Sequence, residues 1–273
     1  MIATDLDGTL LNHQRKVSER DWATLVAAGA AGIVRVIATG RSLFSARTVL
    51  SDDLPIDYLV YSSGVAAVRW SDGESVFANQ MAPADVQATI DALRECECDF
   101  MVQRAAPDSH SFAFKRFSDR ANPDFEHRLE VYREHAQSLG RDAVPDFAVS
   151  QFVAVHPHAG GVELCEHIRT LLPQCNVVRT TSPLDGLSVW IEVFPAGVSK
   201  ADGCDRLARA HGLVAQDVMG VGNDFNDLDL LAWVGAPFVV ANSPEPLRRM
   251  YPVVGSHQES GFSDSVEHWL GGR

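Results

Sequence analysis

Short apolar runs that end in a polar turn and lead into a helical stretch constrain the fold of this chain most. They occur near both ends of the sequence, at residues 1–4, 32–40 (GIVRVIATG), 56–64 (IDYLVYSSG), 217–224 (DVMGVGND) and 237–241 (PFVVA). Buried runs of this kind that alternate with helices are typical of a parallel sheet with helices on both faces. The sequence therefore predicts an α/β protein with a doubly wound, Rossmann-like sheet.

The middle of the chain has a different pattern of predicted elements, in which strands and helices do not alternate regularly. Its predicted helices cover residues 84–95, 123–139 and 161–173, and its predicted strands cover 99–105, 110–117, 148–157 and 176–181. We interpret SVWIEVF (188–194) as the strand that returns to the α/β part. The sequence thus predicts an α/β core, residues 1–81 and 186–273, interrupted by an inserted α+β domain, residues 82–185.

The charge balance limits the partners that such a chain can have. The formal net charge is −13, and a surface this acidic repels nucleic acid and anionic lipid. The five cysteines are an odd number, which favours reduced thiols. Asp5 and Asp7 stand where a secretory signal would need apolar residues. We expect a cytoplasmic protein with neither nucleic-acid nor membrane partners; the oligomeric state is left open.

Polar residues gather where the predicted core strands end. Asp5 and Asp7 follow the first strand, Thr39-Gly40-Arg41 the second and residues 223–227 a later one, while Lys200 begins a helix. Each residue type alone is common in turns and helix caps. However, the carboxyl ends of parallel strands meet at one edge, where ligands bind. We therefore expect Asp5, Thr39, Lys200 and Asn223 to converge on one site.

The residue types at this edge suit phosphoryl transfer with a metal ion. Carboxylate and amide oxygens are ligands for Mg²⁺, and Thr hydroxyl, Gly N–H and Lys groups can hold phosphate oxygens. One carboxylate could attack phosphorus to form an aspartyl-phosphate, and a second could act as general acid and then base. A calcium loop starting at Asp5 is excluded, because Leu10 and Lys16 stand where Gly and Glu are required.

Four segments resemble the motifs of the haloacid-dehalogenase superfamily of phosphohydrolases. They are DLDGTLL (5–11), ATGR (38–41), GVSKADG (197–203) and GNDFNDLDLL (222–231). Their order is similar to that of the Cof-type (IIB) branch, which includes sugar-phosphate phosphatases. The stretch between Thr39 and Lys200 far exceeds one strand–helix–strand unit of about 30 residues, so the inserted domain lies there, as the caps of this branch do.

The resemblance implies a role for each matching residue. Asp5 resembles the nucleophile and a Mg²⁺ ligand, and Asp7 resembles the general acid/base, with its carbonyl on the metal. The phosphate ligands would be the Leu6 and Gly40 N–H groups, the Thr39 hydroxyl, Lys200 and Asn226. Asp227 resembles a carboxylate on the metal side or directly behind it. The implied activity is Mg²⁺-dependent hydrolysis of a small phosphorylated metabolite, a sugar phosphate, through an aspartyl-phosphate.

The chain departs from the family pattern at two places. Asn223 stands where the family usually has an aspartate that ligates Mg²⁺, so Asn223, Asp224 or Asp227 could complete the metal shell. Ser63-Gly64 replaces an Asn-Gly pair that is common after the third strand.

Two other functions are compatible with parts of this pattern. A receiver-like phospho-acceptor also combines an acidic cluster with a Thr and a Lys, but it lacks an acid/base residue at the position of Asp7 and has no inserted domain. A phosphomutase or phosphotransferase on the same fold would keep every core motif, and the sequence does not separate it from a phosphatase.

Overall fold

The chain forms two compact units, each with its own sheet. The computed structural model describes residues 1–117, 121–140, 143–157, 160–182 and 188–272. The first unit contains Met1–Phe77 and Ser199–Arg273, and the second contains Ala78–Val198. In the described part of the chain, no helix is both long enough and apolar enough to cross a membrane.

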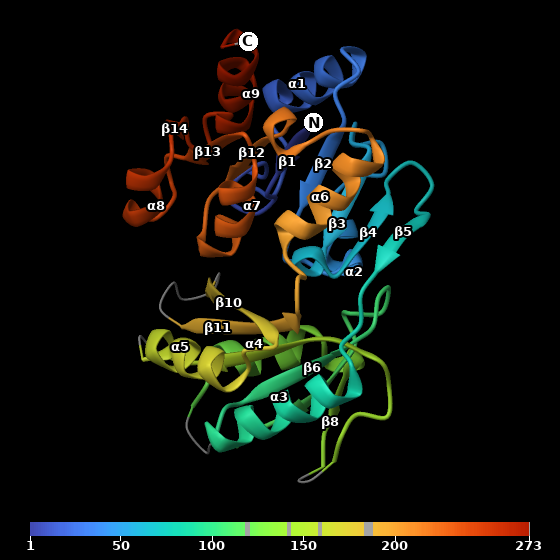
Figure 1. Ribbon diagram of the computed structural model, residues 1–273, viewed down its shortest axis with the longest axis vertical. Helices are drawn as coiled ribbons and strands as arrows, with labels where there is room; N and C mark the ends of the chain where they lie inside the picture. The colour runs from blue at the N-terminus through green and yellow to red at the C-terminus, as the bar shows by residue number, and fades with distance from the viewer. Residues whose placement is uncertain (118–120, 141–142, 158–159, 183–187, 273) are drawn as a thin grey trace. The chain divides into compact units, whose positions relative to one another are not determined.

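The first unit is built on a largely parallel sheet (Figure 1). Among the described residues, its eight strands run in the order β14-β13-β12-β1-β2-β3-β4-β5. Their bounds are β1 (Ile2–Thr4), β2 (Arg35–Ala38), β3 (Tyr58–Tyr61), β4 (Ala66–Arg69), β5 (Ser75–Ala78), β12 (Met219–Gly222), β13 (Ala236–Val240) and β14 (Val253–Val254). β1 lies at the centre and pairs in parallel with β2 and β12, so the carboxyl ends of these strands share one edge.

Helices of the first unit bury both faces of this sheet. They are α1 (Glu19–Ala30), α2 (Leu43–Arg47), α6 (Lys200–Ala210), α7 (Leu228–Trp233), α8 (Glu245–Met250) and α9 (Gly261–Gly271), with single 3-10 turns η1 (Ser62–Gly64), η3 (Ala215–Asp217) and η4 (Phe225–Asp227). Leu207 of α6 and Leu230 of α7 pack on Ala3, Val36 and Val60. The alternating residues Ile2, Ile37 and Leu59 are also fully buried. Because successive side chains point to opposite faces, both faces are covered.

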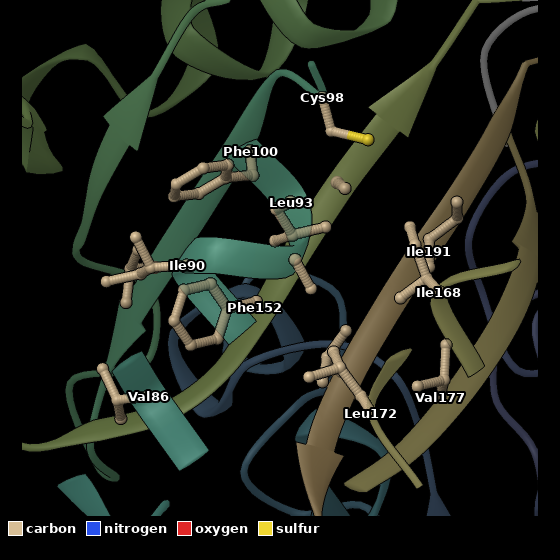
Figure 2. Packing of buried hydrophobic residues seen from close by; sticks show 14 of the residues in the cluster. Val86, Ile90, Leu93, Cys98, Phe100, Phe152, Ile168, Leu172, Val177 and Ile191 are labelled. Atoms are coloured by element: carbon tan, nitrogen blue, oxygen red, sulfur yellow. The ribbon is translucent and has the colours of Figure 1, made fainter. Parts of the chain in front are cut away.

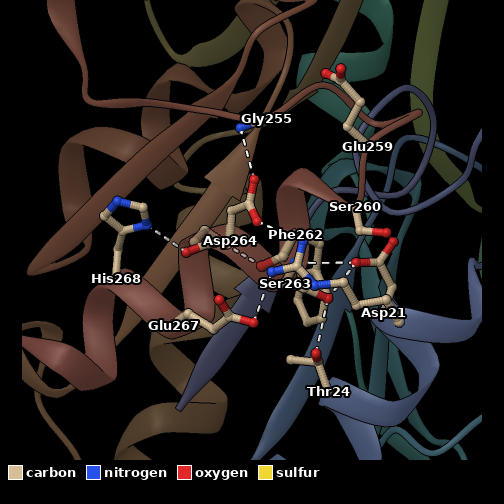
Figure 3. A network of polar contacts seen from close by, with 12 residues as sticks. Asp21, Thr24, Gly255, Glu259, Ser260, Phe262, Ser263, Asp264, Glu267 and His268 are labelled. Carbon is tan, nitrogen blue, oxygen red and sulfur yellow. Dashed lines mark hydrogen bonds and ion pairs between the residues drawn. The ribbon is translucent and has the colours of Figure 1, made fainter.

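A polar network joins α1 to α9 (Figure 3). The buried Asp21 carboxylate accepts hydrogen bonds from the Ser263 backbone N–H at 3.1 Å and from the Ser263 hydroxyl at 2.7 Å. The Thr24 hydroxyl donates to Ser263 Oγ at 2.9 Å, and Arg20 pairs with Asp264 at 2.7 Å. This network ties the last helix of the chain to the first.

The second unit is a mixed sheet with helices on both faces. In the part of the unit that the structure describes, six strands run in the order β10-β11-β9-β6-β7-β8. They are β6 (Phe100–Arg104), β7 (Phe112–Lys115), β8 (Ala136–Ser138), β9 (Val149–His156), β10 (Cys175–Thr181) and β11 (Val189–Pro195). The helices are α3 (Pro83–Glu95), α4 (Pro123–Val131) and α5 (Gly161–Leu171), with the turn η2 (Arg133–His135).

Alternation along the strands divides the core of the second unit in two. Ile90 of α3 and Ile168 of α5 pack with Phe100, Phe152 and Ile191 on one face (Figure 2). Phe125 of α4 packs with Met101, Phe112, Val153 and Val155 on the other face. The unit therefore has a complete core of its own.

The predicted fold class is confirmed: a parallel-sheet α/β core contains an inserted α+β unit. One strand prediction is wrong, because residues 188–194 do not return to the core. β11 pairs antiparallel with β9 and β10 and belongs to the second sheet. The predicted boundary at 185/186 lies outside the described residues. The helix predicted over 123–139 ends at Val131 and is followed by η2 and β8.

Candidate active site

A buried lysine flanked by two aspartates forms the centre of the site. Ser199 caps α6 by accepting a hydrogen bond from the Asp202 N–H at 3.1 Å, which makes Lys200 the first residue of the helix. Lys200 Nζ donates to Asp5 Oδ1 at 2.7 Å and to Asp227 Oδ1 at 2.6 Å. The Lys200 and Asp227 side chains are 0% exposed and that of Asp5 is 7% exposed. One ammonium group thus faces two carboxylates in a buried environment.

Burial and the neighbouring charges shift the pKa values of Asp5 and Lys200. Burial raises the pKa of Asp5 to about 7, the neighbouring Asp227 carboxylate adds to the rise, and Lys200 opposes it. Burial alone would lower the pKa of Lys200, but Asp227 and Asp5 together hold it above its ordinary value. Lys200 therefore stays charged, and the remaining negative charge is free to attract a proton or another cation.

Asp227 also fixes the turn that follows β12. Its Oδ2 accepts hydrogen bonds from the N–H groups of Asn223 at 2.8 Å and Asp224 at 3.1 Å. A Cβ atom at Gly222 would lie 2.6 Å from this carboxylate, so the close approach requires glycine. Both oxygens of Asp227 thus accept hydrogen bonds from the chain. Through these bonds Asp227 fixes the Lys200 ammonium group and the backbone at Asn223.

The Asn223 amide lies against Asp5 and the Asp7 carbonyl. In one orientation its nitrogen donates to Asp5 Oδ2 and to the Asp7 oxygen, both at 3.2 Å. In the other, Oδ1 faces these two oxygens and accepts from the Thr9 hydroxyl at 3.3 Å. Three oxygens that face one another without a donor between them can be satisfied by a cation. Carboxylate, amide and backbone carbonyl oxygens are a donor set that fits Mg²⁺.

Among the described residues, acidic, His and Cys side chains do not by themselves form a metal site. No group of three His, Cys, Asp or Glu side chains is arranged to hold a metal ion within the described ranges. A metal at the Asp5 site would therefore depend on the Asn223 amide and the Asp7 carbonyl. Asp224 is engaged in its own turn, where Oδ1 accepts from the Phe225 N–H at 2.8 Å.

Arg41 holds the carboxylate of Asp7. Arg41 Nε donates to Asp7 Oδ2 at 2.6 Å and Nη2 to Oδ1 at 2.7 Å, while Nη1 donates to Ser45 Oγ at 2.9 Å. The Arg41 backbone N–H donates to the Thr39 hydroxyl at 3.1 Å. Asp7, 48% exposed, is accessible enough to meet a ligand, whereas Asp5 is buried. The predicted nucleophile and acid/base thus lie in different environments two residues apart.

The turn after β2 meets the turns after β3 and β12. A Cβ atom built on Gly40 would lie 3.5 Å from Ser63 Oγ and 3.9 Å from Asn226 Nδ2. Leu6 lies between the two aspartates with its side chain fully buried. The structure therefore places all the predicted site residues at the carboxyl edge of β1, β2 and β12 or at the start of α6. Their roles remain predictions.

Sequence reasoning gave no role to two residues of this edge. Arg41 is part of the ATGR segment, but nothing in the sequence shows that its guanidinium reaches Asp7. Ser63 differs from the residue usual in the family, which was the only signal that could have drawn attention to it.

Comparison with known proteins identifies the family of this chain. Residues 2–266 match the model of the haloacid dehalogenase-like hydrolase family. The chain belongs to this family. The HMP-PP phosphatase of Yersinia pseudotuberculosis serotype O:1b (strain IP 31758) is 25% identical over 277 residues, which cover 99% of this chain and 95% of that protein. The HMP-PP phosphatase of Serratia proteamaculans (strain 568) is 26% identical over 278 residues, with the same coverage.

A solved structure shows the same fold. A sugar phosphatase of haloacid dehalogenase subclass IIB superposes with a TM-score of 0.77 at 18% identity, covering 98% of both chains. At this identity the likeness establishes the fold alone. The resemblance predicted from the four motifs is confirmed: the chain is a hydrolase of this family, and its relatives support a general phosphatase function.

Proposed function

We propose that this protein is a Mg²⁺-dependent phosphatase that hydrolyses a small phosphomonoester through an aspartyl-phosphate on Asp5. The observation that carries the proposal is the buried Lys200, whose Nζ lies 2.7 Å from Asp5 Oδ1, with Asp7 two residues beyond at an exposed position. A charged lysine beside the nucleophile can hold both its carboxylate and a phosphoryl oxygen.

The metal would be held by Asp5, the Asp7 carbonyl and the Asn223 amide oxygen. Bound there, Mg²⁺ would supply positive charge to the transferring phosphoryl group. We assign Asp227 a positioning role, because its two oxygens are engaged by Lys200 and by the turn at Asn223. Thr39, Lys200, Asn226 and the N–H groups of Leu6 and Gly40 would bind the phosphate oxygens.

The reaction would proceed by two displacements at phosphorus, and Asp7 would transfer a proton in each. In the first, a carboxylate oxygen of Asp5 forms a bond to phosphorus while the bond to the leaving oxygen breaks, and Asp7 gives that oxygen a proton. In the second, a water oxygen bonds to phosphorus, Asp7 takes a water proton, and the Asp5–phosphorus bond breaks. Free phosphate, an alcohol and the starting enzyme result.

The substrate class we favour is a sugar phosphate, with the first unit as catalytic core and the second as the domain that selects the substrate. The subclass IIB neighbour is named a sugar phosphatase and the sequence relatives are named HMP-PP phosphatases. The two names differ, so both kinds of phosphate ester belong in a test.

A phosphate-release screen with and without Mg²⁺ tests this proposal. It should include sugar phosphates, nucleotides and vitamin phosphates. We expect the protein to release phosphate from a narrow group of small phosphomonoesters, and we expect EDTA to abolish this release. A phosphoryl group that stays on the protein without release would favour the receiver-like alternative. Its transfer to another hydroxyl without release would favour a phosphomutase or phosphotransferase.

A further inference from the structure

A buried serine hydroxyl at the edge of the site has no hydrogen-bond partner among the described residues. Ser63 is 4% exposed, and no described residue offers a partner to its Oγ. Buried hydroxyl groups are normally hydrogen-bonded, and an unpaired one costs free energy that the fold must offset. A buried hydroxyl without a protein partner therefore needs an explanation, and one explanation is that it binds a ligand.

The backbone at this serine is also in an unfavourable conformation. Ser62 and Ser63 have φ angles of 49° and 53°, a region that residues other than glycine rarely adopt. Such conformations persist where the surrounding structure fixes them, and they concentrate at functional sites. Here the Ser63 N–H donates to the Thr39 carbonyl at 2.9 Å, and the Ser62 N–H donates to the Arg41 carbonyl at 2.7 Å. These bonds hold the turn against the ATGR segment.

The next residue, Gly64, packs against the backbone at the start of α6. A Cβ atom at Gly64 would lie 2.0 Å from the Ser199 carbonyl oxygen, so glycine alone permits this contact. The turn at residues 62–64 is thus held between the turn after β2 and the start of α6. Ser63 Oγ lies 3.5 Å from the position of a Gly40 Cβ, on the side of Gly40 where Asn226 Nδ2 also lies.

We propose that the Ser63 hydroxyl donates a hydrogen bond to a phosphoryl oxygen of the substrate. The proposal rests on the function proposed above, since Gly40 and Asn226 are phosphate ligands in that account. The site would supply a neutral donor from the turn after β3 in addition to Thr39, Lys200 and Asn226. The conformation of Ser62 and Ser63 fixes the hydroxyl at this position before the substrate arrives.

The test compares Ser63→Ala and Ser63→Gly with the wild type. Both variants remove the hydroxyl, and glycine also relieves the positive φ. Inorganic phosphate is the probe, measured as a competitive inhibitor of p-nitrophenyl phosphate hydrolysis. Because hydrogen bonds to charged groups are the strong ones, we expect the inhibition constant of phosphate and the KM each to rise about tenfold or more in both variants, with a smaller change in kcat. The melting temperature of both variants should equal or exceed that of the wild type.

Ser243→Ala is the matched control. Its hydroxyl is the other buried serine hydroxyl without a partner in the described part of the chain. This variant should leave the inhibition constant of phosphate within twofold of the wild-type value. A purely structural role for Ser63 predicts lower melting temperatures and no selective loss of phosphate affinity.

The possible outcomes separate this inference from the proposed function. If the wild type hydrolyses phosphomonoesters and binds phosphate, but Ser63→Ala keeps the inhibition constant within twofold, only this inference fails. A change confined to KM, with phosphate inhibition unaltered, would place Ser63 at the leaving group and would also overturn it. If the wild type neither hydrolyses phosphomonoesters nor responds to phosphate, both proposals fail.

Discussion

Arg41 and Asp7 form a bidentate ion pair, with Nε 2.6 Å from Oδ2 and Nη2 2.7 Å from Oδ1. The Asp7 side chain is 48% exposed and that of Arg41 is 19% exposed. Pairs so close to solvent typically contribute less than about 1 kcal/mol to stability. The geometry of the pair therefore matters more for the orientation of Asp7 than for the stability of the fold.

Replacing Arg41 by glutamine should affect catalysis more than folding. We expect Arg41→Gln to change the free energy of unfolding by less than about 1 kcal/mol. Its kcat should fall about tenfold or more for an alkyl phosphate, whose leaving group needs a proton, and less for p-nitrophenyl phosphate. Arg20→Gln, which removes a surface pair with Asp264 and Glu267, is the control and should leave both rates unchanged. Equal losses for the two substrates would contradict an orienting role.

Lys200 should be essential to the stability of the first unit. Lys200→Met keeps the length of the side chain but leaves Asp5 and Asp227 buried without their counter-ion. Removing one partner of a buried ion pair typically costs about 3–5 kcal/mol, and urea unfolding would measure it. Adding Asp227→Asn should recover part of the loss. Arg209→Met, at an ion pair whose arginine is 76% exposed, should cost less than about 1 kcal/mol. A similar small effect for Lys200→Met would contradict the buried cluster.

The contribution of Asp5 to the stability of the metal-free protein should fall as the pH rises. The Asp5 pKa is raised from 3.8 to about 7, so the folded state holds a proton that the unfolded state releases. Between about pH 4 and pH 7 the unfolded state binds fewer protons, and the contribution of Asp5 to stability is lost as the pH rises through the folded-state pKa. Melting temperatures in EDTA between about pH 5 and pH 8 would show this as a difference between wild type and Asp5→Asn. Parallel pH profiles for the two proteins would disprove it.

Asn223 offers a direct test of the metal site. Its amide lies 3.2 Å from both Asp5 Oδ2 and the Asp7 oxygen, so Asn223→Asp adds a negative charge beside the proposed Mg²⁺ position. We expect the variant to need less Mg²⁺ for half-maximal activity, with unchanged substrate choice and lower stability in EDTA. Asn242→Asp, at a nearby amide that donates to the Gly8 carbonyl, is the matched control for charge. If the Mg²⁺ requirement of Asn223→Asp does not move, Asn223 is not a ligand.

The sequence predicts the parallel strands β1, β2, β3, β12 and β13 well, because they are short, mostly apolar runs bounded by turns. The sequence analysis does not predict β4, β5 or β14; of these, β5 is largely exposed and β14 spans two residues. β11 was assigned to the wrong sheet. Trp190 and Glu192 alternate as in any strand, and only the antiparallel pairing with β9 and β10 determines the sheet.

The site likewise has a part that residue type and spacing predict and a part that depends on three-dimensional contacts. Residue type and spacing are enough to place Asp5, Asp7 and Asn223 at one edge, because parallel strands align their carboxyl ends. Lys200 reaches the same edge from the start of α6, although the strand before it, β11, belongs to the second sheet. The contact of Arg41 with Asp7 and the unpaired hydroxyl of Ser63 depend on side-chain direction and on a positive φ angle. Neither can be deduced from residue type alone.

The most direct test of the central claim is to trap the phosphoryl group on Asp5. Wild type, Asp7→Asn and Asp5→Asn would be mixed with a substrate from the release screen, quenched in acid and analysed by mass spectrometry of the peptide that contains residue 5. We predict one added phosphoryl group on Asp5 in the wild type, and none in Asp5→Asn, whose turnover should fall by more than about a thousandfold, or about 4 kcal/mol in the barrier. Asp7→Asn should form and lose this adduct more slowly. An Asp5→Asn variant that retains turnover within about tenfold of wild type, a barrier change of about 1.4 kcal/mol, would contradict the account.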